Sequence, residues 1–140
     1  MVCAALATWL APSQVQGVRE NLFRLPRLKR AAELVANADL VACTGIFDYL
    51  PTGDAVAMLR FFTQALAHSG HAIVFNFAPQ NPTRAYMEWI GNWYLIYRDE
   101  AALRELAHAA GIATEKYQLA ADATGIDLYL DVRAMSAFTP

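Results

Sequence analysis

The stretch His71-Ala-Ile-Val-Phe-Asn-Phe77 is the strongest strand signal in the sequence, because apolar, β-branched and aromatic residues dominate it. Before it, residues 53–67 have an apolar face at helical spacing, which predicts a helix. Thr52 can cap the start of this helix, and Ser69-Gly70 can end it, with Gly70 in a left-handed conformation. Residues 39–43 (Asp-Leu-Val-Ala-Cys) indicate an earlier strand, buried under helices on both faces. This strand–helix–strand order predicts an α/β fold with a largely parallel sheet. The expected inner face of the helix is Ala55, Leu59, Phe62 and Leu66.

The N-terminal part continues the alternation of helix and strand. Residues 3–10 indicate a short buried helix that stops at Pro12, and residues 15–19 indicate a short strand. A loop over residues 20–26 leads into a helix over residues 27–36. The apolar face of that helix is expected to contain Leu28, Ala31, Ala32 and Val35.

The C-terminal part predicts two helical regions and a hairpin. Residues 81–98 are unusually aromatic, and Pro82 suits a first helical position. Asp99 can cap a helix that continues to residue 110, where Gly111 stops it. Residues 113–119 and 126–133 then indicate two antiparallel strands, with residues 122–125 connecting them. The whole order is a doubly wound pattern with an antiparallel ending.

Composition narrows the function classes. The chain has 140 residues, which predicts one domain, and 56% of them are hydrophobic against 17% charged. The net charge is −2 without a strong basic footprint, so nucleic acid is a poor candidate for a partner. The two cysteines, Cys3 and Cys43, form neither a disulfide scaffold nor a zinc pattern, so we expect a cytoplasmic protein without a metal. No apolar stretch is long enough to span a membrane.

Two longer phrases carry a family resemblance. Asp39-Leu-Val-Ala-Cys-Thr-Gly-Ile-Phe-Asp-Tyr-Leu50 resembles the fourth strand and following loop of class I S-adenosylmethionine-dependent methyltransferases. Ala65-Leu-Ala-His-Ser-Gly-His-Ala-Ile-Val-Phe75 resembles the approach to their fifth strand, and Arg19-Glu-Asn-Leu22 resembles the end of their third. The terminal hairpin is similar to their sixth and seventh strands. The resemblance covers residues 3–133 and implies a Rossmann-like sheet with an antiparallel C-terminal hairpin.

The resemblance also implies where S-adenosylmethionine would bind. Asn21 and Leu22 would form the turn that contacts adenine, or else an ordinary turn after a strand. Thr44, Gly45, Ile46 and Phe47 follow the fourth strand, where ligands of open α/β sheets bind, or else form a plain turn with a core phenylalanine.

The expected methyl acceptor is a small molecule or a fatty acyl group. Asp48 and Tyr49 would face it, although Asp48 could equally cap a turn. In the aromatic segment, Tyr86, Tyr97 and Arg98 would line its pocket, with Arg98 able to pair with a carboxylate; packing is the alternative role. Phe47-Asp-Tyr-Leu-Pro51 and the aromatic segment look like bacterial methyltransferases that form hydroxy-fatty-acid methyl esters. No catalytic residue is identified, because the sulfonium is already activated and alignment of the acceptor supplies most of the rate gain.

The sequence departs from the family in one respect. Its seven glycines are isolated, and it contains no GxGxG loop. The apparent alignment leaves out the first two strands of a sheet whose family order is 3-2-1-4-5-7-6. We therefore expect an N-terminally incomplete domain over residues 1–140 whose ability to hold the cofactor alone is doubtful. The exposed sheet edge would pair with a second copy or with residues 15–19. A non-catalytic, dimerising remnant of a methyltransferase is the alternative function.

Overall fold

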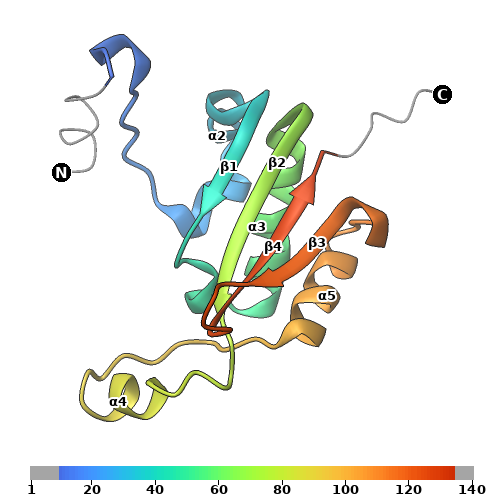
Figure 1. Ribbon diagram of the computed structural model, residues 1–140. Coiled ribbons are helices and arrows are strands. Elements are labelled where there is room, and N and C mark those ends of the chain that lie inside the picture. Colours follow the sequence, from blue (N-terminus) through green and yellow to red (C-terminus); the bar gives the residue numbers. More distant parts are fainter. Residues whose placement is uncertain (1–9, 135–140) are drawn as a thin grey trace.

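A four-stranded mixed sheet forms the centre of the molecule in the computed structural model, which describes residues 10–134 (Figure 1). Its strand order is β1-β2-β4-β3. β1 and β2 are parallel, whereas β4 is antiparallel to both β2 and β3. This order corresponds to the 4-5-7-6 part of the sheet that the resemblance implies, so the predicted fold class is confirmed. The strands are β1 (Ala38–Cys43), β2 (Leu66–Phe77), β3 (Tyr117–Ala121) and β4 (Asp127–Arg133).

Helix α3 (Thr52–Ala65) and strand β2 follow each other without a loop. The helix starts after Pro51, and Thr52 makes no capping hydrogen bond, so the predicted cap is wrong. The predicted helix end at Ser69-Gly70 is also wrong, because both residues belong to β2. Gly70 is not left-handed; a Cβ there would lie 2.5 Å from the carbonyl oxygen of Ala38. Close approach of β1 therefore explains this glycine.

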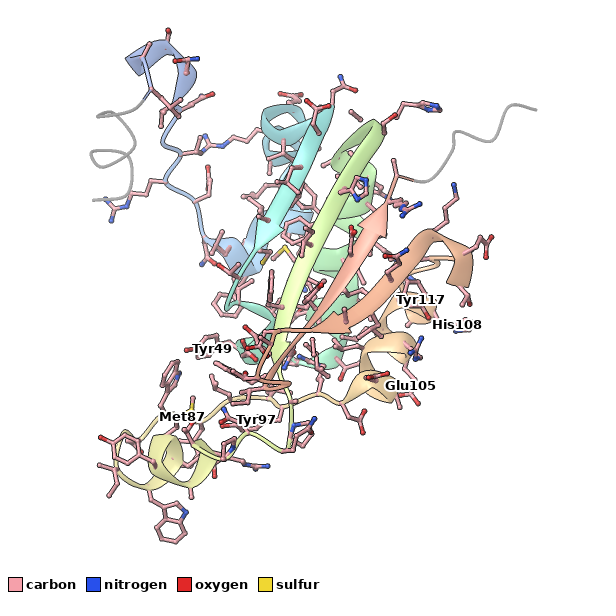
Figure 2. The ribbon with its side chains drawn as sticks, viewed as in Figure 1. Tyr49, Met87, Tyr97, Glu105, His108 and Tyr117 are labelled. Carbon is pink, nitrogen blue, oxygen red and sulfur yellow. The ribbon has the colours of Figure 1, made fainter. Side chains whose placement is uncertain are left out.

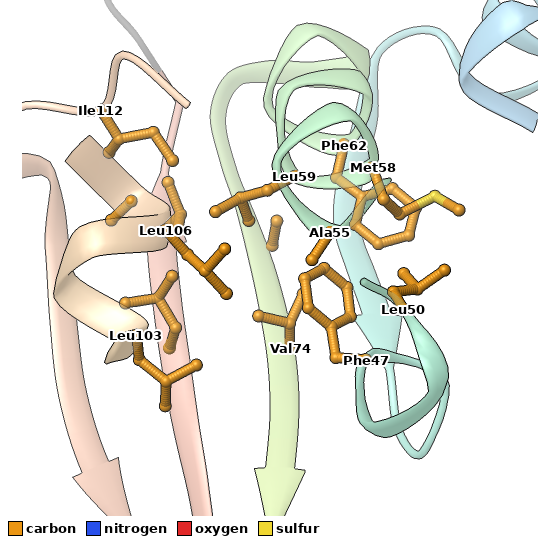
Figure 3. Close-up of a cluster of buried hydrophobic side chains, with 14 of the residues drawn as sticks. Phe47, Leu50, Ala55, Met58, Leu59, Phe62, Val74, Leu103, Leu106 and Ile112 are labelled. Atoms are coloured by element: carbon orange, nitrogen blue, oxygen red, sulfur yellow. The ribbon is translucent and has the colours of Figure 1, made fainter. Parts of the chain in front are cut away.

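The hydrophobic core lies between one face of the sheet and helices α3 and α5 (Glu100–Ala109), as Figure 3 shows. Three predicted inner positions of α3, Ala55, Leu59 and Phe62, are buried. From the sheet, alternate residues of β2 and β4 point into this core because side chains of a strand alternate between its faces. The sheet contributes Ala72, Val74, Leu128, Leu130 and Val132.

The opposite face of the sheet carries no helix among residues 10–134 (Figure 1). Its alternate residues in β2 and β4 are partly exposed, and the rings of Phe75 and Tyr129 lie 5.5 Å apart there. On β1, Leu40 is 58% exposed. The prediction that residues 39–43 form a strand is confirmed, but the prediction that helices cover both its faces is wrong in the described part of the chain.

The C-terminal elements follow the sequence closely. Asp99 caps α5 by accepting a hydrogen bond from the Ala102 backbone N–H, and Gly111 ends it with a φ of +82°. The strands of the predicted hairpin are antiparallel. The first starts later than expected, because residues 114–116 form a 3-10 turn. In the connection, Asp122 accepts hydrogen bonds from the backbone N–H groups of Ile126 and Asp127.

The N-terminal part contributes less regular structure. Helix α2 (Lys29–Val35) lies within the predicted helix over residues 27–36, after a 3-10 helix at Leu22–Arg27. Residues 15–19 form no strand, so the expected strand there and its pairing with β1 are wrong. Within residues 10–134, β1 pairs only with β2, and its other edge is open. The helix expected over residues 3–10 falls almost entirely outside the described residues.

The aromatic segment forms a lobe, residues 78–97, that projects beyond the sheet (Figure 1). Its only α-helix is α4 (Arg84–Trp89), much shorter than the predicted helical region. Pro82 does not start it, because the Asn81 side chain closes a turn by accepting from the backbone N–H and the hydroxyl of Thr83. At its far end the chain turns away at residues 90–92, where Asn92 has a φ of +48°.

Candidate functional site

A pocket of about 340 Å³ lies beside the carboxyl end of β1. The strand contributes its last three residues and the loop after it contributes two more, while the 3-10 helix at residues 22–27 and the core side of α3 close the pocket. Its walls are mostly apolar. The lining residues are Leu22, Leu25, Val41, Ala42, Cys43, Thr44, Ile46, Met58 and Phe62.

Three of the six residues predicted to bind the cofactor line this pocket. Leu22 reaches it from the 3-10 helix, and Thr44 and Ile46 reach it from the loop after β1, although Leu22 and Thr44 lie 22 positions apart in sequence. Gly45 lies between the latter two with a φ of +89° and has open space where a Cβ would stand. The turn therefore favours glycine for its backbone conformation.

The other two predicted cofactor residues have structural roles. Asn21 caps the 3-10 helix, because its side-chain oxygen accepts from the Phe23 backbone N–H 3.0 Å away. Phe47 is completely buried and packs against Phe62 in the core, with 6.4 Å between the ring centroids. Its side chain is therefore not presented to a ligand in this structure, and the alternative role as a core phenylalanine is the one observed.

The thiol of Cys43 is the only reactive sulfur at the pocket. Burial and the nearby Asp48 carboxylate raise the pKa of this thiol to about 11. The thiol is therefore protonated at neutral pH, and since the thiolate is the nucleophilic form, Cys43 is unsuited to covalent catalysis.

A buried polar network ties together the loop after β1 and two other segments. Arg98 donates to the backbone oxygens of Phe47 (2.8 Å) and Leu50 (2.6 Å) and to Oδ1 of Asn76 (2.6 Å). Nδ2 of Asn76 donates in turn to Oδ1 of Asp48, at 3.0 Å. The same carboxylate oxygen accepts from the Phe77 backbone N–H at 2.8 Å. The loop after β1, the end of β2 and the segment before α5 are thereby held as one unit.

Burial acts on both charged members of this network. It raises the pKa of Asp48 and lowers the pKa of Arg98, while the charge of each partly opposes the shift of the other. Asp48 is 3% exposed and Arg98 is 4% exposed. The predicted roles of both in facing an acceptor are thus not reproduced, because the side chains are buried and occupied by partners within the protein.

Two of the three remaining predicted acceptor residues, Tyr49 and Tyr97, lie where the lobe meets the sheet. Figure 2 shows Tyr49 and Tyr97 at this end of the molecule, with Met87 of α4. The indole N–H of Trp93 donates to the Tyr49 hydroxyl at 2.6 Å, so the lobe contacts the loop after β1. The third, Tyr86, is exposed on α4.

Tyr97 has an unusual environment. Its hydroxyl is buried and has no hydrogen-bond partner among residues 10–134, while its ring lies 4.4 Å from the Arg84 guanidinium carbon. Burial, together with the Glu88 carboxylate, raises the pKa of this phenol, so it remains a protonated donor at neutral pH. A buried donor without a partner is costly unless a ligand or water supplies one.

Sequence reasoning missed several residues of the site. Asn76 lies inside the predicted strand and gave no signal beyond being the one amide in an apolar run. Leu25 and Met58 are ordinary apolar residues, and only the folded chain shows that they line the pocket. In residues 10–134 no group of histidine, cysteine and acidic side chains is arranged to hold a metal ion. Over the same residues no helix is both long and apolar enough to cross a membrane.

Known structures share this fold, although no protein-family model and no curated protein sequence matches the chain. A protein of Bordetella parapertussis described as "a possible exported protein" is 16% identical, with a TM-score of 0.71 over 96% of this chain and 49% of its own. An O-methyltransferase family protein from Burkholderia thailandensis is 14% identical, with a TM-score of 0.63 over 89% of this chain and 37% of its own.

Human N-acetylserotonin methyltransferase, solved in complex with S-adenosylmethionine, is also 14% identical. Its TM-score is 0.62, over 94% of this chain and 37% of its own. The chain thus spans half or less of the length of the structures that it matches. Its sheet and helices have the fold of the C-terminal part of a Rossmann-like methyltransferase domain.

Proposed function

We propose that this chain is the C-terminal part of a class I S-adenosylmethionine-dependent methyltransferase that acts on a small-molecule acceptor. The strand order carries the proposal, because it places the pocket at the carboxyl end of β1, in the position that such sheets use for ligands. The similarity of the fold to known methyltransferase structures supports the same activity. A cytoplasmic location is proposed only from the cysteine content.

The pocket fits one end of the cofactor better than the other. About 340 Å³ is at the small end of ligand pockets, which suits a nucleobase with its sugar but not the whole cofactor. Leu22, Ile46 and Met58 offer apolar surface on which an adenine ring can pack, and Thr44 offers a hydroxyl. No acidic side chain lines this pocket to take ribose hydroxyls, and residues 10–134 contain no glycine-rich loop for the methionine end.

The chain's own residues would then position the loop and the acceptor. The Asp48–Asn76–Arg98 network fixes the loop after β1, which keeps Thr44 and Ile46 at the pocket. Bound cofactor supplies an activated methyl group, and transfer depends on holding the acceptor in line with it. In this proposal the network is a positioning device and no side chain needs to act as a nucleophile.

The acceptor is proposed to bind where Tyr49 and Trp93 meet, close to Tyr97. Aromatic rings provide apolar surface, and the unpartnered Tyr97 hydroxyl can donate to an oxygen of the acceptor. This combination suits an apolar molecule with a polar head. A fatty acyl carboxylate, as in the hydroxy-fatty-acid subgroup, is the specific acceptor that we propose.

Binding of S-adenosylhomocysteine by the 140-residue chain, measured by calorimetry, tests the cofactor half of this proposal. Val41 lines the pocket from the face of β1 that packs towards the core, so Val41→Phe should narrow the pocket and weaken binding about tenfold or more. Ala120→Phe is the matched control, since Ala120 is exposed on β3 away from the pocket. The proposal fails for this chain if the wild type does not bind, or if both variants weaken binding equally.

A second candidate function is a non-catalytic module that dimerises, and the open edge of β1 favours it. A strand edge with unpaired backbone groups beside the exposed Leu40 is suited to pairing with a second copy. Analytical ultracentrifugation should then show a dimer for the wild type and a monomer for Leu40→Lys, because a charge on an edge strand opposes pairing. A wild-type monomer at all concentrations rejects this candidate.

A further inference from the structure

A basic hollow lies at the end of the sheet opposite the pocket, where β2 starts and β4 ends. Its volume is about 270 Å³. It is lined by two imidazoles, one ammonium and one guanidinium, together with the backbone around a serine and a glycine. These residues are His68, His71, Lys116, Arg133, Ser69 and Gly70.

Strand register explains why these basic side chains converge. His71 of β2 lies directly opposite Arg133 of β4. On the other side of β4, Tyr117 at the start of β3 lies opposite Val132, and Lys116, the last residue of the 3-10 turn before β3, lines the same hollow as Arg133. Residues directly opposite each other in adjacent strands project from the same face, with Cβ atoms about 5 Å apart. His71 and Arg133 therefore project from the same face of the sheet, and Lys116 lies next to them at the end of the 3-10 turn before β3.

The charges in the hollow are only partly compensated. Nδ1 of His71 lies 3.0 Å from Oδ1 of Asp131, and Lys116 takes part in an interaction of its own. Neither Arg133 nor His68 makes a side-chain hydrogen bond or ion pair with another described residue. None of the lining residues is acidic. Arg133 and Lys116 thus bring two positive charges to one hollow in a chain whose net charge is −2.

We propose that this hollow binds a phosphate group of a small phosphate ester or diphosphate. A phosphate carries nearly two negative charges at neutral pH, and the planar guanidinium of Arg133 can donate two parallel hydrogen bonds to it. His68 and the Ser69 hydroxyl can add further donors. The volume lies below the usual range for whole ligands, so the hollow suits the phosphate while the rest of the molecule stays outside. This proposal is independent of methyl transfer.

Titration with pyrophosphate, followed by calorimetry, tests the site in the full chain. Arg133→Gln should weaken binding about tenfold, because it removes a charge-assisted pair of hydrogen bonds. Arg104→Gln is the matched control: Arg104 is exposed on α5, where it pairs with Glu100, and this variant should change the affinity less than about twofold. Arg133→Lys should recover part of the lost affinity, because lysine keeps the positive charge but cannot donate two parallel hydrogen bonds.

Two further measurements keep the test decisive. Circular dichroism of each variant checks folding, and if Arg133→Gln is unfolded, His68→Gln replaces it with the same expected loss. Co-sedimentation with phosphatidylcholine vesicles containing phosphatidic acid distinguishes a lipid headgroup from a free phosphate. Binding of pyrophosphate or of the vesicles that depends on Arg133 or His68 supports the site, and the one that binds identifies the source of the phosphate. Absence of binding in both arms, or equal losses in the variant and the Arg104→Gln control, overturns the proposal.

Discussion

Replacement of Arg98 by leucine should cost about 4 kcal/mol of folding free energy. Arg98 is buried and donates to three acceptors, the backbone oxygens of Phe47 and Leu50 and the side-chain oxygen of Asn76. The substitution leaves all three without this donor and leaves the carboxylate of Asp48 without its positive neighbour. Each unsatisfied buried polar group costs about 1–3 kcal/mol, and breaking a buried ionic arrangement costs about 3–5 kcal/mol. Relaxation and burial of the leucine side chain keep the expected total below the simple sum.

Equilibrium unfolding in urea, followed by circular dichroism, measures this loss. With a slope of about 2 kcal/mol per molar urea, the midpoint should fall by about 2 M. Arg104→Leu is the control, because Arg104 forms an exposed pair with Glu100 at 3.2 Å and should change stability by less than about 0.5 kcal/mol. Equal midpoint shifts for the two variants would refute the role given to the network.

A double-mutant cycle sharpens the same prediction. If Asp48 and Arg98 act through Asn76 as one unit, Asp48→Asn combined with Arg98→Leu should cost clearly less than the sum of the two single losses. Additive losses would mean that the two charged groups stabilise the fold separately. The cycle therefore distinguishes a coupled network from two independent buried residues.

Three other predictions concern single positions. Gly70→Ala should destabilise the protein by about 2 kcal/mol, because the new Cβ would lie 2.5 Å from the Ala38 carbonyl oxygen. Gly53→Ala is the control in the same urea assay. It should be neutral or slightly stabilising, because a Cβ at this helical position has open space. Cys43 should react slowly with iodoacetamide at pH 7, and its rate should still be rising at pH 9, as followed by mass spectrometry of the labelled peptide, because its thiol pKa is about 11; a plateau below pH 9 contradicts this. Hydrogen bonds from Thr124 and the backbone lower the pKa of Asp122 from 3.8 to about 2, so its stabilising effect is present above pH 4 and is lost as the pH falls towards 2. The urea midpoint of the wild type should therefore fall over this pH range by more than the midpoint of Asp122→Asn. Identical dependence of the two midpoints on pH would contradict this.

The sequence predicted those elements whose signals are local. The strand at residues 71–77, the Asp99 cap and the helix stop at Gly111 are each set by a few neighbouring residues, and the structure confirms them. The strand expected at residues 15–19 failed, because a short apolar run becomes a strand only when another strand supplies hydrogen-bond partners. The helix end predicted at Gly70 was wrong for a similar reason, because Gly70 allows β1 to approach closely and does not form a turn.

The candidate site was predictable only in part because it depends on contacts distant in sequence. Thr44 and Ile46 were predictable because they follow a strand directly. The burial of Arg98 was not, because a charged residue at the end of an aromatic segment equally suits an exposed, ligand-facing position. Its three acceptors come from residues 22 to 51 positions away, and only the folded chain brings them together.

The topology makes the two proposed sites separable. Because β1 and β2 are parallel, the loops that follow them leave the sheet at the same end, and the Asp48–Asn76–Arg98 network and the pocket form there. Because β4 is antiparallel to β2, its final residue Arg133 lies instead beside the start of β2, at the opposite end. If the strand in the position of β4 were parallel to β2, its first residue and not its last would lie beside the start of β2. The reversal of the last hairpin therefore builds the basic hollow, and substitutions in one site should leave ligand binding at the other unchanged.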